Sequence, residues 1–195
     1  MTRFGSIELV MNDSVALKEQ TKYERMWDIP AYRTYSPGEK ALPSMLSLMK
    51  EGSSIGDFGC GTGRASQMLR AHGFMVTAID FASNCLDPNV NVPFHQACLW
   101  ELPDDMLFDF GYCTDVMEHI PTGKVSATLK AIAGATRYGC FFQIATFKDR
   151  FGDEIGERLH LSVYSADVWE SALQKHWPKV RLINGGREAR FWVSH

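Results

Sequence analysis

The stretch that decides the fold is residues 55–64, which read IGDFGCGTGR. In this stretch Gly59, Gly61 and Gly63 alternate with other residues just after the acid Asp57. Glycine has no Cβ, so the backbone at these positions can adopt positive φ and lie against a ligand. The free N–H groups of a following helix would point toward the same ligand. The stretch therefore predicts a strand, a glycine turn and a helix that together form a binding site.

The chain after the glycine turn continues this pattern. Residues 64–71 carry apolar side chains at helical spacing, and Gly73 is placed to end the helix. Residues 74–80, FMVTAID, are apolar and β-branched, as expected of a strand that is covered on both faces. The strand ends in Asp80, about 20 residues beyond the glycines, where an acid accepts hydrogen bonds from ribose hydroxyls. We therefore expect a nucleoside cofactor between the glycine turn and Asp80.

Two nucleoside cofactors fit this unit. The dinucleotide fingerprint G-x-G-x-x-G requires a glycine at position 64, where this chain has Arg64. The observed D-x-G-x-G-x-G resembles motif I of the class I S-adenosylmethionine-dependent methyltransferases. The resemblance implies that the methionine and ribose parts meet the turn residues Gly59, Cys60, Gly61 and Gly63. It also implies that Asp57 serves the amino group. An NAD(P)-dependent Rossmann oxidoreductase remains the alternative, disfavoured by Arg64 and by the lack of a recognisable Tyr-x-x-x-Lys pair.

Two further stretches extend the resemblance. Residues 109–121, DFGYCTDVMEHIP, are similar to the family's fourth-strand motif, and residues 97–103, ACLWELP, resemble the third-strand loop that lies along the adenine ring. The resemblance implies further cofactor-binding residues at the strand ends, namely Asp80, Phe81, Cys98, Leu99 and Asp115. Many relatives have an acid in place of Cys98. Here a main-chain carbonyl or a neighbouring side chain would have to accept from the adenine amino group.

The rest of the chain predicts an α/β domain. A helix follows Pro121, a buried strand covers residues 140–146, a second helix follows Ser165, and two short strands flank residues 185–186. With the resemblance, this implies a seven-stranded, mostly parallel Rossmann-like sheet with helices on both faces and an antiparallel C-terminal hairpin. Ligands of such a sheet gather outside the carboxyl ends of its strands.

The predicted methyltransferase domain covers residues 37–195, and residues 1–36 form an N-terminal extension. The first 21 residues are mixed and turn-prone, and residues 23–35 concentrate aromatic side chains, among them Trp27, Tyr32 and Tyr35. Two interpretations of this segment stay open. It is either a lid that closes over the cofactor and excludes water or a cover for an apolar sheet edge.

Composition narrows the function classes. The chain has 195 residues and a formal net charge of -3 at pH 7, which argues against broad nucleic-acid binding because that binding needs basic surfaces. No apolar run reaches the ~20 residues that cross a bilayer, and the N-terminus lacks a secretory core. We therefore expect a cytoplasmic protein without a membrane partner. The cysteines have no C-x-x-C spacing, so their pattern indicates neither a zinc motif nor a disulfide framework.

The candidate catalytic residues follow the fourth strand. A sulfonium methyl group is already activated, so the protein's main task is to align donor and acceptor and to exclude water. A hydroxyl or a protonated amine acceptor also needs a base, for which His119 is the candidate. Glu118 would orient His119 or help to shape the pocket. The alternative left open is that this Glu-His pair caps the next helix or lines the pocket without taking a proton.

A metal site is the second possibility for the same motif. Asp115, Glu118, His119 and the later His160 are similar to the ligands with which small-RNA 2'-O-methyltransferases hold a divalent ion. Ubiquinone-pathway O-methyltransferases have a related E-x-x-E-H pattern. The first acid here is Asp115 rather than a glutamate, and its reach is shorter. We therefore assign no metal ligands, and a divalent metal is not the favoured cofactor.

These patterns predict an enzyme that transfers a methyl group from S-adenosylmethionine to an oxygen or nitrogen atom of a small acceptor, with S-adenosylhomocysteine as the product. A non-catalytic S-adenosylmethionine-binding protein is the remaining alternative beside the oxidoreductase. The motifs define the methyl donor far better than the acceptor, because one fold supports many acceptors.

Overall fold

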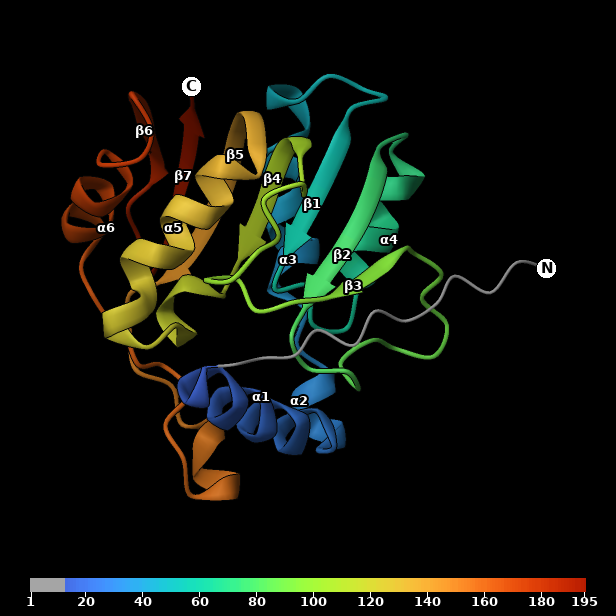
Figure 1. The fold of residues 1–195 in the computed structure, drawn as a ribbon, viewed down its shortest axis with the longest axis vertical. Coiled ribbons are helices and arrows are strands. Elements are labelled where there is room, and N and C mark those ends of the chain that lie inside the picture. The colour runs from blue at the N-terminus through green and yellow to red at the C-terminus, as the bar shows by residue number, and fades with distance from the viewer. Residues whose placement is uncertain (1–12) are drawn as a thin grey trace.

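A seven-stranded sheet forms the centre of the computed structural model, which describes residues 13–195 (Figure 1). The strand order is β3-β2-β1-β4-β5-β7-β6. The strands are β1 (Ser54–Phe58), β2 (Met75–Asp80), β3 (Phe94–Gln96), β4 (Phe108–Thr114), β5 (Thr136–Ala145), β6 (Lys179–Asn184) and β7 (Glu188–Ser194). Strands β1 to β5 are parallel, and β7 is antiparallel to both β5 and β6. The predicted fold class, including the C-terminal hairpin, is confirmed.

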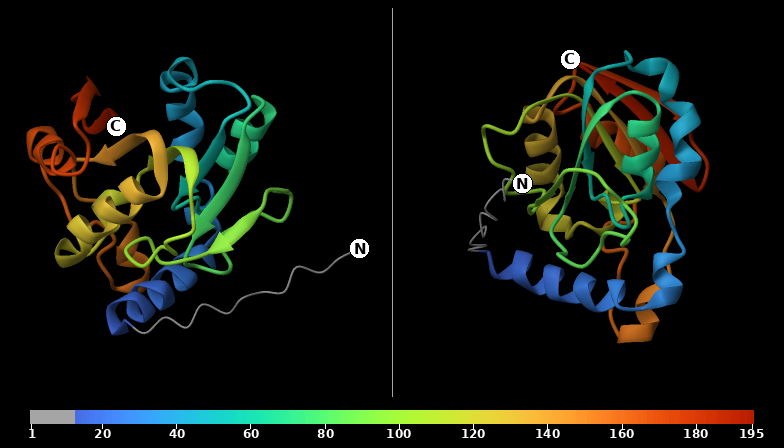
Figure 2. Two further views of the ribbon diagram at one scale, coloured as in Figure 1. Left: turned by 45° about the horizontal axis from the view of Figure 1, so that its top comes forward. Right: turned by 90° about the vertical axis from the view of Figure 1, so that its right-hand side faces the viewer.

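Helices cover both faces of the sheet (Figures 1 and 2). The helices after the N-terminal segment are α3 (Pro37–Ala41), α4 (Arg64–Ala71), α5 (Val125–Gly134) and α6 (Ala166–Leu173). Leu69 of α4 packs with Ile55 of β1 in one apolar cluster, together with residues of α3. Leu129 of α5 and Phe142 of β5 belong to a second cluster, which also contains residues of α6. Each face of the sheet is therefore covered by an apolar layer, and the strand ends are where polar side chains can meet a ligand.

The segment between α3 and β1 is not a regular helix. After α3 the chain makes two 3-10 turns, Leu42–Ser44 and Leu46–Leu48. Pro43 lies inside the first turn, where its ring and missing N–H prevent α3 from continuing. Buried Leu42 and Met45 nevertheless pack on the sheet.

The N-terminal extension is more regular than its sequence suggested. Residues 14–21, which were expected to be turn-prone, instead form most of α1 (Ser14–Trp27), and the short α2 (Pro30–Arg33) follows. Asp13 caps α1 by accepting a hydrogen bond from the amide of Val15 at 2.9 Å. The buried residues of α1 include Ala16, Tyr23 and Met26, which lie on one side of the helix. This side rests on the rest of the protein, so tertiary packing stabilises the helix.

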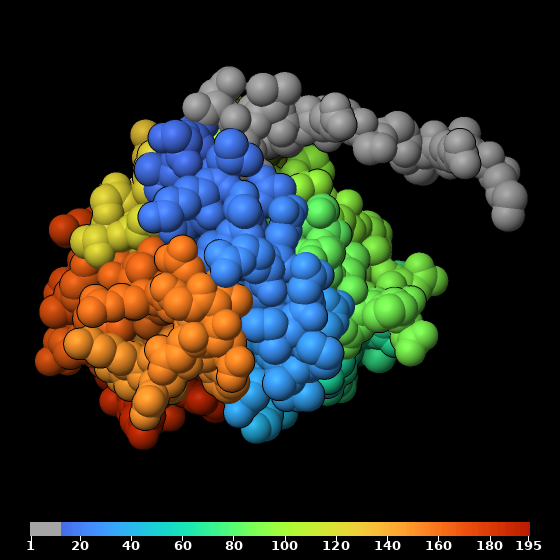
Figure 3. Space-filling model, turned by 90° about the horizontal axis from the view of Figure 1, so that it is seen from below, coloured from blue at the N-terminus to red at the C-terminus, as the bar shows by residue number. Residues whose placement is uncertain are grey.

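Helices α1 and α2 cross the carboxyl ends of the parallel strands (Figure 2). Seen from that end, α1 and α2 lie beside the segment near residue 155 (orange) and the loop that follows β2 (green) (Figure 3). These three segments cover the carboxyl ends of the strands, where the candidate site lies. None of the helices in residues 13–195 has the length and apolar composition needed to span a membrane.

Candidate active site

The glycine turn follows β1 and has the backbone that the sequence predicted. Gly59 and Gly61 have φ values of +74° and +51°. A Cβ on Gly59 would lie 2.4 Å from the side chain of Val116, and one on Gly61 would lie 2.9 Å from the indole of Trp27. Positive φ and close neighbours both require glycine at these positions. The turn therefore presents bare backbone toward the helix that crosses it.

Asp80 ties the glycine turn to the end of β2. Its Oδ2 accepts a hydrogen bond from the amide of Gly61 at 3.1 Å, and its Oδ1 accepts one from the amide of Ala82 at 3.0 Å. Burial raises the pKa of Asp80 to about 6, although these amide hydrogen bonds act in the opposite direction. The carboxylate is thus held by the main chain at the position predicted for it.

Asp57, the second-last residue of β1, is more deeply buried than Asp80. It is 2% exposed, and its Oδ2 accepts a hydrogen bond from the hydroxyl of Ser66 in α4 at 2.5 Å. Burial raises the pKa of Asp57 to about 7. A cation placed next to this carboxyl group would therefore favour its ionised form.

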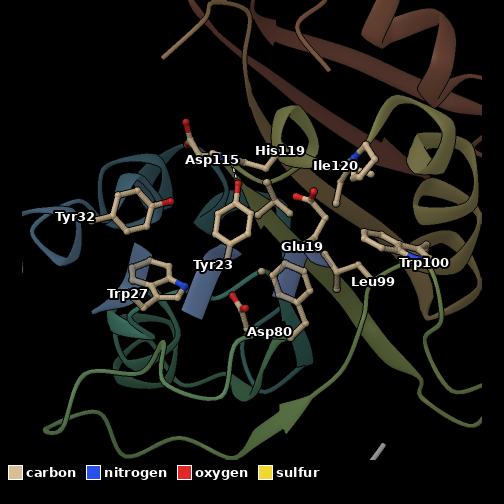
Figure 4. A pocket seen from close by; sticks show the side chains of 14 residues that line it. Glu19, Tyr23, Trp27, Tyr32, Asp80, Leu99, Trp100, Asp115, His119 and Ile120 are labelled. Atoms are coloured by element: carbon tan, nitrogen blue, oxygen red, sulfur yellow. Dashed lines mark hydrogen bonds between the residues drawn. The ribbon is translucent and has the colours of Figure 1, made fainter. Parts of the chain in front are cut away.

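Two adjoining cavities lie between the strand ends and α1. The first, here called the Leu99 cavity, measures about 80 Å³. Its lining comes from α1, α2, the glycine turn and the loops after β2, β3 and β4: Glu19, Tyr23, Trp27, Tyr32, Gly59, Asp80, Phe81, Leu99, Trp100, Asp115, Val116, His119, Ile120 and Pro121. Figure 4 shows Tyr23 between Asp80 and His119, with Leu99 and Trp100 on one side and Trp27 and Tyr32 on the other.

The second, here called the Phe147 cavity, measures about 220 Å³. Its predicted members are Asp57, Gly59, Cys60, Gly61, Asp115, His119 and His160. Aromatic side chains from the two segments that cross the strand ends complete its wall: Trp27, Tyr32, Tyr35, Phe147 and Phe151. No lysine or arginine lines either cavity within residues 13–195.

Two predicted cofactor residues line neither cavity. Cys98 is completely buried, and its neighbours Leu99 and Trp100 form the wall instead. Gly63, with φ of +73°, is the N-cap residue of α4. A Cβ on Gly63 would lie 2.6 Å from Leu86, so this glycine accommodates the loop after β2 rather than facing a cavity.

The residues after β4 are fixed by contacts to β5. Asp115 has a φ of +53°, and its Oδ2 accepts a hydrogen bond from the amide group of Gln143 at 2.6 Å. Burial raises the pKa of Asp115 to about 6. Glu118 is completely buried, and its Oε1 accepts a hydrogen bond from the amide of Ala145 at 3.0 Å. Burial, followed by the charge of Asp115, raises the pKa of Glu118 well above its ordinary value and so favours its protonated form. Through the hydrogen bond to Ala145, Glu118 joins the ends of β4 and β5.

His119 is held by Tyr23 of α1 and not by Glu118. The hydroxyl of Tyr23 lies 2.6 Å from Nδ1 of His119, as the dashed line in Figure 4 shows. Burial and then the neighbouring His160 lower the pKa of His119 well below its ordinary value. Burial also raises the pKa of Tyr23, so the phenol stays protonated. Its O–H donates a hydrogen bond to Nδ1 of the neutral imidazole. The partner of His119 was missed from sequence, where only the aromatic character of residues 23–35 pointed to this segment.

His160 completes this side of the site. Its ring is 4.6 Å from that of His119, centroid to centroid, in an edge-to-face arrangement. Nδ1 of His160 donates to the carbonyl of Phe147 at 2.5 Å, and Nε2 lies 3.2 Å from the carboxylate of Asp149. The segment after β5 is thereby tied to the β4 motif.

Only three of the four residues that were compared with metal ligands lie close together. One potential ligand atom each of Glu118, His119 and His160 lies within 4.8 Å of the other two. Asp115, the first acid of the predicted set, is not in this group and contacts Gln143 instead. The structure thus brings His160 to the motif and leaves Asp115 outside the cluster.

Arg33, at the end of α2, connects the crossing helices to the loop after β2. Its guanidinium donates to the carbonyls of Trp27, Asn84, Cys85 and Leu86. It also donates to the carboxylate of Asp87 at 3.0 Å. This single side chain was not singled out from sequence, because its partners are brought to it only by the fold.

Comparisons with known proteins agree with the fold and the motifs. A model of the methyltransferase domain family matches residues 38–181. Among curated proteins, the chain is similar to the ubiquinone biosynthesis O-methyltransferase of Rickettsia akari (strain Hartford), with 36% identity over 72 residues, 33% of this chain and 29% of that protein. The enzyme of the same description from Rickettsia felis (strain ATCC VR-1525 / URRWXCal2) is also 36% identical over 72 residues, 33% of this chain and 30% of its own length. The match therefore spans less than a third of these relatives.

Solved structures with the same fold share little sequence with this chain. The 1,6-didemethyltoxoflavin-N1-methyltransferase of Burkholderia thailandensis, with bound S-adenosylhomocysteine, has a TM-score of 0.66 at 15% identity, covering 92% of this chain and 87% of that one. The magnesium protoporphyrin IX methyltransferase of Synechocystis PCC 6803 has a TM-score of 0.62 at 16% identity, covering 93% and 94%. These similarities establish the fold.

Proposed function

The chain belongs to the methyltransferase domain family, the class I S-adenosylmethionine-dependent methyltransferases, and on this premise we propose that it methylates a hydroxyl oxygen of a small acceptor. The observation that carries the proposal is the hydrogen bond between the phenol of Tyr23 and Nδ1 of His119, 2.6 Å long, at the junction of the two cavities. Because Nδ1 of His119 accepts a hydrogen bond from the neutral hydroxyl of Tyr23, the same atom is suited to accept one from the hydroxyl of a methyl acceptor. Family membership also argues against the oxidoreductase alternative.

The residues around the Leu99 cavity fit an adenosyl ligand. Asp80 offers a carboxylate to the ribose hydroxyls, and Phe81 and Leu99 offer apolar walls to the adenine ring. A Cβ at Gly59 or Gly61 would collide with Val116 or Trp27, so glycine keeps the backbone there accessible to a ligand. When bound, S-adenosylmethionine supplies an electrophilic methyl group on a sulfonium sulfur.

The Phe147 cavity would receive the rest of the donor and the acceptor. Asp57 and Cys60 line it on the side of the glycine turn, and Asp57 would hold the amino group. Phe147 and Phe151 line it from the segment after β5, and they offer an apolar surface to the acceptor. Aromatic walls of this kind exclude water from the reacting groups.

His119 would take the proton of the acceptor hydroxyl at Nδ1. Its low pKa keeps the imidazole neutral, so the lone pair of Nδ1 is free to accept. For this the hydroxyl of Tyr23 must give up its place to the acceptor hydroxyl. Glu118, which accepts a hydrogen bond from the amide of Ala145, would position His119. Asp115 would lie beside the methyl donor.

We further propose that α1 and α2 are the lid that was one of two interpretations of the extension. Trp27 and Tyr32 line both cavities, Tyr23 lines the Leu99 cavity, and the indole of Trp27 lies against Gly61. The cavities, at about 80 Å³ and 220 Å³, are smaller than the ~300 Å³ or more of ordinary ligand pockets. Trp27 must therefore shift for a ligand to reach the turn. Residues 1–12 of the predicted extension lie outside the described residues.

The state of the cysteines supports the cytoplasm as the site of action. All five cysteines are free thiols, and reducing compartments maintain this state.

The test is a methyl-transfer assay with S-adenosylmethionine that carries a deuterated methyl group. Matched phenol and aniline acceptors are compared, and mass spectrometry locates the label. We expect label on oxygen, and His119→Ala should lower kcat by about 10²-fold or more. His72→Ala, at the exposed end of α4, is the control and should keep full activity. Label on nitrogen alone would contradict the proposal, and S-adenosylhomocysteine binding without any turnover would favour the non-catalytic alternative.

A further inference from the structure

A second cluster of potential ligands lies beside the glycine turn. The Sγ atoms of Cys60 and Cys85 and a carboxylate oxygen of Asp80 all lie within 4.8 Å of one another. Cys60 belongs to the turn after β1, Asp80 ends β2, and Cys85 lies in the loop after β2. The two cysteines are far apart in sequence, so the fold brings together a pair that the cysteine spacing did not indicate.

The main chain holds all three residues in place. The amide of Cys60 donates to the carbonyl of Ile79 at 3.0 Å. The carbonyl of Cys85 accepts from Arg33 at 2.9 Å. Asp80 accepts from two amides, as described above. The three side chains are 9%, 0% and 6% exposed for Cys60, Cys85 and Asp80. The cluster is therefore a fixed, buried group with two sulfur donors.

We propose that Cys60, Cys85 and Asp80 bind one thiophilic divalent cation, zinc or cadmium, with a fourth coordination position left open. Ligand atoms around a tetrahedral zinc ion stand about 3.5 to 3.8 Å apart, so shifts of roughly 1 Å complete the site. Sulfur donors select zinc and cadmium over magnesium and calcium, which prefer oxygen. The ion reaches the cluster through the Phe147 cavity, which Cys60 lines.

Binding replaces two S–H bonds by two metal–sulfur bonds and releases two protons. Metal affinity should therefore increase with pH, because protons compete with the ion for the thiolates.

The cluster shares Asp80 with the proposed ribose site. If the proposed function holds, the ion and the adenosyl ligand compete for the same carboxylate. Their coupling must be reciprocal: each weakens the binding of the other by the same factor. The metal would then be an inhibitor that acts at the cofactor site, and this consequence alone depends on the proposed function.

The experiment is a cadmium titration of the full-length, reduced protein, followed by the thiolate-to-cadmium absorption band and by calorimetry. We expect one ion per chain and a charge-transfer band that corresponds to two thiolates. Cys60→Ala and Cys85→Ala should each weaken binding at least about 100-fold, more than the 10–100-fold effect of outer-shell changes. Cys140→Ala, a buried cysteine of β5 outside the cluster, is the matched control and should keep the band. Circular dichroism of each variant verifies that it is folded.

Each outcome decides a separate point. A band that persists in both Cys60→Ala and Cys85→Ala, or the absence of a thiolate band in the folded wild-type protein, overturns the proposal. Binding without a thiolate band that is lost in His160→Ala would assign the ion to the Glu118, His119 and His160 group and overturn the proposal as well. A band with no S-adenosylhomocysteine binding to the metal-free protein supports the metal site and contradicts the proposed function. Cys85→Ala is the safer variant, since it leaves the glycine turn unchanged.

Discussion

Replacing Glu118 by glutamine tests whether this residue is a neutral structural acid. Glu118 is completely buried, Oε1 accepts from the amide of Ala145 at 3.0 Å, and Oε2 has no hydrogen-bond partner among residues 13–195. Glutamine keeps the carbonyl oxygen that accepts from Ala145 and has no ionisable proton. Glu118→Gln therefore removes the titration and leaves the packing nearly unchanged.

The effect on stability has a definite sign. Burial raises the folded-state pKa of Glu118 above the 4.5 of the unfolded chain. The folded protein then keeps a proton that the unfolded chain loses, so the free energy of unfolding falls as pH rises above 4.5, until the folded pKa is reached. Each pH unit in this window corresponds to about 1.4 kcal/mol. Between pH 5.5 and pH 7.5, the wild-type protein should thus lose stability that Glu118→Gln does not lose, over the part of this interval that lies below the folded pKa.

Urea unfolding at pH 5.5 and at pH 7.5 measures this difference directly. We expect Glu118→Gln to gain stability relative to the wild-type protein as the pH rises, and the exposed Glu154→Gln to show no such gain. A constant difference between Glu118→Gln and the wild type at the two pH values would refute the reasoning, because it would mean that Glu118 is ionised in the folded protein throughout.

Three further substitutions test the lid and the cofactor site. Tyr23→Phe removes the hydrogen bond to His119 and should lower the free energy of unfolding of the ligand-free protein by about 1–3 kcal/mol in urea, while kcat is retained in the methyl-transfer assay. Trp27→Ala exposes Gly61 and should increase the association rate of S-adenosylhomocysteine in stopped-flow fluorescence, because the indole no longer has to shift. Asp80→Asn removes the charged acceptor for the ribose hydroxyls and should weaken S-adenosylhomocysteine binding by roughly 10- to 100-fold in calorimetry, in line with about 1.5–3 kcal/mol for a hydrogen bond to a charged group.

Each of these substitutions has a control of the same type away from the site. Tyr138→Phe should leave the free energy of unfolding and kcat unchanged, Trp192→Ala the association rate, and Asp105→Asn the affinity for S-adenosylhomocysteine. Loss of kcat in Tyr23→Phe would place the phenol in the proton transfer itself. An unchanged association rate in Trp27→Ala would remove Trp27 from the entry path, and full affinity in Asp80→Asn would contradict the ribose contact.

The glycine turn and the elements beside it could be predicted because they depend on local patterns, whereas the seven-stranded sheet was predicted with the help of the family resemblance. Residues 64–71 form α4 over the predicted range, and the alternation of glycines after Asp57 translates directly into positive φ. Helix α1 was missed because its stability comes from tertiary packing of one face and not from its polar composition.

The candidate site was predicted at the level of strand ends and not of partners. Asp80 and His119 lie where the motifs placed them, but the partner of His119 is Tyr23, from a segment distant in sequence. Cys98 is turned into the core, and Leu99 takes the position in the cavity wall. Contacts of this kind depend on how separate segments meet, which spacing along the chain does not encode.

The hydrogen bonds of Arg33 join α1 and α2 to the loop after β2, so opening either segment without the other would break these bonds. The amides of residues 14–33 and 81–93 should therefore exchange with deuterium as one cooperative unit, with a common opening free energy below that of the sheet. Ligands that hold this unit closed should slow exchange in both segments together, including in the loop residues that never touch the ligand.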